Sequence, residues 1–429
     1  MKVSIKQIQD GTVTTPKGFL AGGTYAGIKT SVEDALDLGI LYSEVPAAVA
    51  GVFTTSKVVS PSVIVSRKRV SSGAARAVVA NSGCANCCVG DYGRRDAEEM
   101  TSLAAKHVGV SVDEVLVCST GLIGVELPMA LVRQNIGNIE LSTEGGNAFA
   151  RSILTTDSRT KQSGVSLNIS GTDITIGGAA KGVGMIHPNM ATMLAFITTD
   201  ANVEHGLLQQ ALKAAADVSF NMIDVDGDQS TNDTVLLFSN GAAGGNQIME
   251  DSPSGRLFIE ALEYLSVHLA KELVRDGEGA ERIFAVTVEG AVSVADARMA
   301  AREVASSSLV KAMVHGRDPN WGRLMMALGK SGAEIQEPSI DIFINDIHIV
   351  HEGKAIPYYV DAVVGGMNVP EVRTPIMIRM KATTSAPRGN SNSMRNMPCS
   401  SMGSSYRLTS PSPFCPPSRV ASCSAGTVC

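Results

Sequence analysis

The stretch Ala-Ala-Lys-Gly-Val-Gly-Met-Ile-His-Pro-Asn-Met-Ala-Thr-Met-Leu-Ala-Phe-Ile-Thr-Thr-Asp-Ala, residues 179–201, lies near the middle of the chain. Its first half contains Lys181 and two closely spaced glycines, which allow the backbone to approach another group closely. Its second half, from Met193 to Thr199, is an apolar run of strand length. Thr192 therefore stands at the start of a predicted buried strand.

A threonine hydroxyl becomes a good nucleophile when a base lies beside it, and one such base is the threonine's own free α-amine. This amine has a pKa of about 7.7 to 8, so part of it is neutral and basic at physiological pH. It exists only after the peptide bond between Ala191 and Thr192 is cut. The hypothesis is self-cleavage, in which the Thr192 hydroxyl attacks the Ala191 carbonyl. The alternative is that Thr192 is an ordinary β-branched strand residue.

The segment Lys181–Leu194 resembles the processing site of the ornithine acetyltransferases, also called glutamate N-acetyltransferases, of the cyclic arginine pathway. The resemblance covers about residues 5–379. Other motifs match the same family in the same order: Asn81-Ser82-Gly83, Ser119–Gly124, Thr155-Thr156-Asp157, Asp224–Asp228, Ser230–Thr234, Asp276–Ala280 and Asp318–Arg323.

The resemblance implies a mixed α/β fold of the self-processing kind, with an N-terminal threonine nucleophile, related to the self-processing aminopeptidases. It implies an alpha chain of residues 1–191 and a beta chain of residues 192–380, intertwined and assembled as an α₂β₂ heterotetramer.

The implied activity is a ping-pong acetyl transfer from N-acetylornithine to glutamate through an acetyl ester of Thr192. Thr120 and Gly121 are implied to form the oxyanion hole, and Thr155, Lys181 and Glu278 to contact the substrate. Whether acetyl-CoA is a second acetyl donor, which would make the enzyme bifunctional, stays open.

The residues themselves support part of this assignment. A strand predicted over residues 114–118 ends in Ser119-Thr120-Gly121, where a free glycine N–H and a hydroxyl are the donors that an oxyanion hole needs. Glu278 stands between two glycines and has little cover, so it is free to reach into a cleft. The structural alternatives are a helix end at Thr155 and a surface carboxylate at Glu278.

Composition narrows the class of protein. A hydrophobic share of 44% with 18% charged residues is typical of a globular protein, and a net charge of −6 disfavours a nucleic-acid partner. No apolar run is long enough to span a membrane, and the first twenty residues lack signal-peptide features. We expect a cytoplasmic bacterial enzyme.

The sequence predicts no cofactor and no metal. It contains no phosphate-binding Walker loop and no convincing dinucleotide fingerprint. Cys84, Cys87 and Cys88 have no second cysteine pair to complete a zinc site, so buried thiols are expected. Residues 224–233 begin like a calcium loop but have Val235 where the loop needs glutamate, which favours a solvated or structural loop.

Hydrophobic periodicity predicts mixed secondary structure without a strict βαβ repeat. Asp96 is a plausible N-cap for the first helix. Strands are predicted over residues 48–53, 62–65, 76–80 and 282–289, hairpins over 165–176 and 340–351, and helices over 127–136, 144–154, 206–220, 254–275 and 296–306.

The tail, residues 381–429, contains no Asp or Glu and is rich in Ser, Pro, Arg and Cys, which predicts disorder. The family that the chain resembles closes with an active-site Asn and a nearby Thr or Ser. No recognisable version of that segment is present, and Asn390, Asn392 and Asn396 are not assigned to it. A frame-shifted reading of the gene would account for the change.

Three functions therefore stay open. The first is an ornithine acetyltransferase, the second is a related self-processing aminopeptidase or amidohydrolase that passes its acyl group to water, and the third is a folded remnant with impaired turnover.

Overall fold

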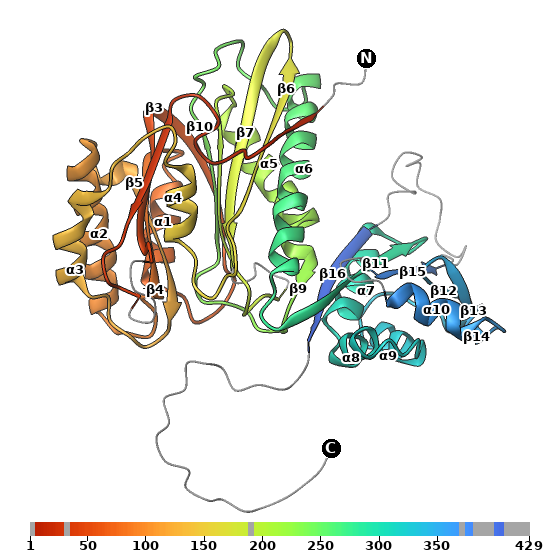
Figure 1. Ribbon diagram of the computed structural model, residues 1–429. Helices are drawn as coiled ribbons and strands as arrows, with labels where there is room; N and C mark the ends of the chain where they lie inside the picture. The colour runs from red at the N-terminus through yellow and green to blue at the C-terminus, as the bar shows by residue number, and fades with distance from the viewer. Residues whose placement is uncertain (1–4, 30–34, 188–192, 369–373, 381–398, 407–429) are drawn as a thin grey trace, which may run out of the picture.

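The computed structural model describes residues 5–29, 35–187, 193–368, 374–380 and 399–406. Within these ranges the chain forms two sheets with helices packed against them, so the prediction of a mixed α/β fold is confirmed (Figure 1). Ala191 and Thr192, the predicted cleavage site, lie outside the described residues.

The larger sheet is mixed, with strand order β1-β6-β7-β8-β10-β3-β4-β5 and β2 paired with β3. Its strands are β1 (Lys6–Ile8), β2 (Phe19–Thr24), β3 (Leu38–Phe53), β4 (Ala74–Cys84), β5 (Val115–Leu122), β6 (Lys161–Ile169), β7 (Thr172–Lys181), β8 (Leu194–Thr199) and β10 (Thr234–Ser239).

Strand β8 lies in the middle of this sheet, between β7, which precedes residues 188–192 in the chain, and β10, which follows them. It pairs antiparallel with β7 and parallel with β10, and β10 in turn pairs with β3. All six β8 residues are buried, with Ala195 and Ile197 in one core cluster and Leu194 and Phe196 in another. Burial on both faces explains the continuous apolar run.

Helices cover both faces of the larger sheet. On one side, α5 (His205–Val218) packs mainly against β3, and α6 (Pro253–Arg275) packs against β6 and β7. Helices α1 (Pro61–Val70) and α2 (Tyr92–Val108) pack against β5, with α3 (Met129–Asn135) beside α2 (Figure 1). Helix α4 (Gly146–Ser152) packs against β2 and β3. Phe149 of α4 meets Phe196 of β8 edge to face, with ring centroids 5.0 Å apart.

The smaller sheet has strand order β14-β13-β12-β15-β11-β16-β9. Its strands are β9 (Ile223–Asp224), β11 (Ala280–Glu289), β12 (Ile340–Ile344), β13 (Ile347–His351), β14 (Lys354–Ala355), β15 (Thr374–Met380) and β16 (Cys399–Tyr406), and its helices are α7 (Val294–Ser306), α8 (Ser308–Gly316), α9 (Gly322–Gly329) and α10 (Val360–Met367). A separate apolar core fills the space between this sheet and its helices.

Two sequence predictions were wrong at helix starts. Residues 62–65, predicted as a strand, lie in α1, because the Ser60 hydroxyl accepts a hydrogen bond from the Ser62 N–H and Pro61 occupies the first turn. These helix-start signals outweigh the strand preference of the β-branched residues in this segment. Helix α2 begins at Tyr92, so Asp96 lies inside the helix and is not its N-cap.

The tail also differs from its prediction where the structure describes it. Residues 399–406 form β16, which pairs antiparallel with β11 and parallel with β9. The prediction of disorder is therefore wrong for these residues.

Deleting residues 381–429 is expected to destabilise the smaller sheet, because β11 loses its β16 partner and becomes an exposed edge. Each lost backbone hydrogen bond contributes about 0.5–1.5 kcal/mol, and β16 pairs with β11 along its whole length, so we expect a loss of several kcal/mol. The control deletes only residues 407–429 and keeps β16. Thermal unfolding followed by circular dichroism compares the two; equal melting temperatures would show that β16 contributes nothing.

Candidate active site

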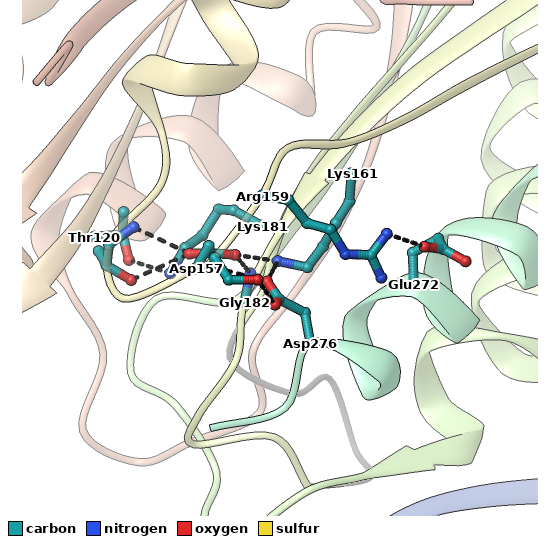
Figure 2. A network of polar contacts seen from close by, with 10 residues as sticks. Thr120, Asp157, Arg159, Lys161, Lys181, Gly182, Glu272 and Asp276 are labelled. Carbon is teal, nitrogen blue, oxygen red and sulfur yellow. Dashed lines mark hydrogen bonds and ion pairs between the residues drawn. The ribbon is translucent and has the colours of Figure 1, made fainter. Parts of the chain in front are cut away.

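Thr120 and Lys181, two of the predicted site residues, meet near the ends of strands in the larger sheet (Figure 2). Thr120 and Gly121 lie near the end of β5, and Lys181 is the last residue of β7. Lys181 stands opposite Leu194, the first residue of β8. The site is therefore next to the point where the chain re-enters the sheet after Thr192.

Lys181 and Thr120 are in direct contact. The Lys181 ammonium donates a hydrogen bond of 3.1 Å to the Thr120 hydroxyl oxygen, and both side chains are buried. Because an ammonium can only donate, the Thr120 O–H proton stays free to point elsewhere. Lys181 thus orients Thr120 as a hydrogen-bond donor.

The conformation at residue 121 requires glycine. Gly121 has a φ of 132°, a region that other residues rarely adopt. A side chain there would also collide with the neighbouring strand, since a Cβ would lie 2.3 Å from the carbonyl carbon of Gly83. The backbones of β4 and β5 therefore approach each other closely at Gly121.

Asp157 is the anion at the centre of the site. Its side chain is fully buried and lies 2.5 Å from the Lys161 ammonium, which also lies 2.5 Å from Asp276 (Figure 2). The Gly182 N–H donates to Asp157 Oδ1 at 2.8 Å. Burial alone would raise the pKa of Asp157, but the ammonium groups of Lys181 and Lys161 outweigh it and lower that pKa to about 2.

Lys181 is held in a low-dielectric environment. Burial lowers the pKa of its ammonium, and Asp157 is the largest opposing influence. Lys161, Asp233 and Glu278 also act electrostatically on Lys181. Several ionisable side chains are therefore coupled within one buried cluster.

Thr155 and Glu278 border this cluster. The Thr155 N–H donates to Asp157 Oδ2 at 3.0 Å, which ties the loop after α4 to the central carboxylate. The Glu278 N–H donates to the Val183 carbonyl at 2.7 Å. A Cβ on Gly184 would lie 2.9 Å from Glu278 Oε2, so that carboxylate passes directly over the glycine. Glu278 is exposed.

Three charged residues near the site were not given roles by the sequence prediction. Lys161 holds Asp157 and Asp276, and Asp233 Oδ1 accepts the Met193 N–H at 3.0 Å. Burial raises the pKa of Asp233 well above its usual range. Asp233 belongs to one of the family-like motifs in the sequence. Lys161 belongs to none, so its ion pairs with Asp157 and Asp276 are seen only in the structure.

Lys29 is a third omitted residue. Burial lowers the pKa of its ammonium to about 8, against the opposing charges of Asp37 and Asp157. Its Nζ donates to the Leu36 carbonyl at 2.9 Å. Lys29 therefore lies within electrostatic reach of the central carboxylate and close to titration at physiological pH.

The loop over residues 224–233 is partly buried and is structural. Asp224 forms an ion pair with Lys311, and its Oδ2 atom lies within hydrogen-bond distance, 2.7 Å, of His187 Nδ1. Asp226 Oδ1 accepts the Ile186 N–H at 3.0 Å. These contacts fix the chain that leads up to Pro188, and the solvated alternative is wrong for the buried Asp224.

The predicted cysteines are free thiols. Cys84, Cys87 and Cys118 are buried as expected, whereas Cys88 is exposed. None of the described helices combines the length and the apolar character that a membrane crossing needs.

A mixed α/β fold with a buried lysine, an oriented hydroxyl and coupled carboxylates at strand ends is the arrangement of an enzyme. The profile of the ArgJ family matches residues 20–389. The chain belongs to the ArgJ family.

Relatives agree with this assignment. The arginine biosynthesis bifunctional protein ArgJ of Dehalococcoides mccartyi is 48% identical over 353 residues, covering 82% of this chain and 87% of the relative. The protein of the same name from Symbiobacterium thermophilum is 49% identical over 350 residues, covering 81% and 87%. A solved structure of ornithine acetyltransferase with ornithine from Mycobacterium tuberculosis is 38% identical, covering 43% of this chain and 98% of that chain, with a TM-score of 0.40.

Proposed function

We propose that the chain cleaves itself between Ala191 and Thr192 and then transfers an acetyl group from N-acetylornithine to glutamate. Membership of the ArgJ family supports this activity. The observation that carries it is the Lys181–Thr120 contact, which leaves an oriented O–H donor beside the strand that begins just after Thr192.

Self-cleavage begins when the Thr192 hydroxyl oxygen attacks the Ala191 carbonyl carbon. The resulting oxyanion accepts hydrogen bonds from the Thr120 hydroxyl and the Gly121 N–H. The C–N bond then breaks, the nitrogen takes up the hydroxyl proton, and an ester joins Ala191 to Thr192. Water hydrolyses the ester and leaves a carboxylate on Ala191 and a free α-amine on Thr192.

Acetyl transfer uses the same groups. The free α-amine of Thr192 takes the proton from its own hydroxyl as that oxygen attacks the acetyl carbonyl of N-acetylornithine. Ornithine leaves with the proton, and the acetyl group stays on Thr192. The neutral amine of glutamate then attacks the ester carbonyl, and the bond from that carbonyl to the Thr192 oxygen breaks. The amine proton passes through the Thr192 α-amine to this oxygen, which restores the hydroxyl as acetylglutamate is released.

The charges in the site suit these substrates. Glu278 is exposed beside Gly184 and can pair with the side-chain ammonium of ornithine. Lys181 stabilises negative charge next to Thr120, either the oxyanion or a substrate carboxylate. Asp157 forms an ion pair with Lys161 and opposes the effect of burial on the pKa of Lys181, and its bond to the Thr155 N–H keeps the neighbouring loop in place.

The activity is tested by incubating the chain with N-acetylornithine, with and without glutamate. Formation of acetylglutamate and ornithine in equal amounts supports the transferase. Release of acetate without acetylglutamate indicates the hydrolase alternative instead. Replacing N-acetylornithine by acetyl-CoA shows whether this second donor is used.

The tail affects this assay. Residues 381–429 lack the family's closing Asn and Thr or Ser, so we expect cleavage to proceed while transfer is slow. A poorly enclosed site misplaces the acyl group and admits water, and each effect slows transfer.

We further propose that the cleaved chains assemble as an α₂β₂ heterotetramer in the cytoplasm and that the enzyme uses no cofactor.

Replacing Thr120 with alanine is expected to slow both self-cleavage and transfer, because each passes through a tetrahedral oxyanion. Loss of one such donor costs about 2.7–4 kcal/mol, or roughly 100- to 1,000-fold in rate. The matched control is Thr101→Ala, since Thr101 is also buried but lies in α2. Unchanged rates in Thr120→Ala would remove Thr120 from the site.

A further inference from the structure

A second cluster of chemically active side chains lies on the smaller sheet, on the hairpin of β12 and β13 (Figure 1). Asp341, His348 and His351 place their ligand atoms within 4.8 Å of one another. In the part of the chain that the structure describes, no other group of three such residues is this close. The proposed acetyl transfer does not use them.

A β-bulge brings the two histidines to the same face. Ile342 stands opposite Val350, but Phe343 stands opposite His348, so β13 contains one extra residue between these pairs. In a regular strand His348 and His351 would point to opposite faces, because side chains alternate. The extra residue cancels that alternation, and Ile349 and Val350 are both fully buried in consequence.

The register completes the cluster with a carboxylate. Extending the Ile342–Val350 pairing by one residue places Asp341 opposite His351, and the His351 Nδ1 atom lies 3.0 Å from Asp341 Oδ1. The Glu352 N–H also donates to Asp341 Oδ1, at 2.9 Å. Asp341 is 5% exposed, so its carboxylate is held in a fixed orientation.

His348 presents a nitrogen without a hydrogen bond. Its Nε2 atom is buried, lies 4.0 Å from Asp341 Oδ1 and makes no hydrogen bond to the described residues. The ring is fixed by stacking on Phe343, with centroids 4.3 Å apart and planes at 14°. A buried polar atom that lacks a partner costs free energy, and a bound ligand would remove that cost.

One cation of β15, Arg379, lies next to the cluster. Arg379, opposite Asp341 on β15, lies with its guanidinium 5.4 Å from the centre of the Phe343 ring. Its Nε atom is 3.7 Å from Glu289. Asp341 is the carboxylate whose oxygen lies close to the ring nitrogens of both histidines.

We propose that Asp341, His348 and His351 bind one divalent transition-metal ion of the zinc, cobalt or nickel class. Two imidazoles and one carboxylate suit these ions, whereas magnesium and calcium prefer oxygen ligands alone. Zinc lies about 2.0–2.2 Å from such atoms, so binding needs only a small closure of the cluster. The His351 side chain is 50% exposed, which gives the ion a path from solvent and leaves positions for water. The ion would join β12 to β13 and stabilise the hairpin.

The test is calorimetric titration of Zn²⁺ into the full, tag-free, metal-free chain. The accessible thiols, among them Cys88, are first alkylated with iodoacetamide, so that they cannot bind the ion. We expect one ion per chain and a rise in melting temperature. His348→Ala and His351→Ala should weaken binding roughly ten-fold or more and abolish the rise.

The matched control is His205→Ala, which removes an exposed histidine at the start of α5 and should leave binding unchanged. If His348→Ala fails to fold, the titration of His351→Ala tests the proposal, because this half-exposed side chain can be removed with less effect on folding. No binding to the alkylated chain, or equal binding in His351→Ala, would overturn the proposal.

Discussion

Replacing Thr192 with alanine is expected to leave the chain uncut and to abolish acetyl transfer. The substitution removes the only atom that attacks in both reactions, and an uncut chain has no α-amine at residue 192 to act as base. Electrophoresis under denaturing conditions measures cleavage, and the formation of acetylglutamate measures transfer.

The matched control is Thr192→Ser, which keeps the hydroxyl and should cleave and transfer at a reduced rate. The variant Thr192→Ala should still fold, because the substitution lies outside β8, whose six buried residues pair with β7 and β10. Cleavage in a folded Thr192→Ala variant would assign the attack to another residue.

Replacing Asp157 with asparagine is expected to destabilise the fold by about 3–5 kcal/mol, the usual cost of breaking a buried ion pair from one side. Lys161 would keep Asp276, but Lys181 would lose its largest opposing charge while staying buried. Urea unfolding in the uncut Thr192→Ala background measures this loss, since folding there involves a single chain.

The control is Glu98→Gln, which breaks the exposed Arg94–Glu98 pair and should cost no more than about 1 kcal/mol. A similarly small loss for Asp157→Asn would show that Asp157 does not stabilise the site.

The effect of Asp157 depends on pH in a defined direction. Its pKa is about 2 in the folded chain and about 3.9 when unfolded. The carboxylate therefore stabilises the fold fully above about pH 4, and this contribution falls as the pH drops toward 2. The difference in stability between the Thr192→Ala background and its Asp157→Asn variant should shrink over that interval. A constant difference would indicate that Asp157 is not the titrating group.

Much of the fold follows from local patterns in the sequence. The apolar run from Met193 became β8, and the hairpin predicted over residues 340–351 became β12 and β13. These predictions succeeded because a run buried on both faces and a short turn at Asn345-Asp346 are local signals. The strand predicted over residues 62–65 failed because a capping serine and a proline decided the local conformation.

The candidate site was only partly predictable, because some of its contacts join residues that are far apart in the sequence. Thr120 and Lys181 were predicted from family-like motifs, and the structure places them in contact, while their roles stay a prediction. Lys161 and Lys29 have no local signature; their importance comes from burial beside Asp157, which depends on the pairing of distant strands. The cluster of Asp341, His348 and His351 was missed because it depends on a bulge, which reverses the alternation that a sequence pattern assumes.

The central claim is that Thr192 becomes an N-terminal nucleophile that carries the acetyl group. Intact-mass analysis tests it most directly, before and after N-acetylornithine is added without glutamate. We predict two pieces, residues 1–191 and 192–429, with the second gaining the mass of one acetyl group at its N-terminus. A single uncut mass from a chain with normal circular dichroism, or two pieces that stay unmodified while ornithine is released, would contradict the account.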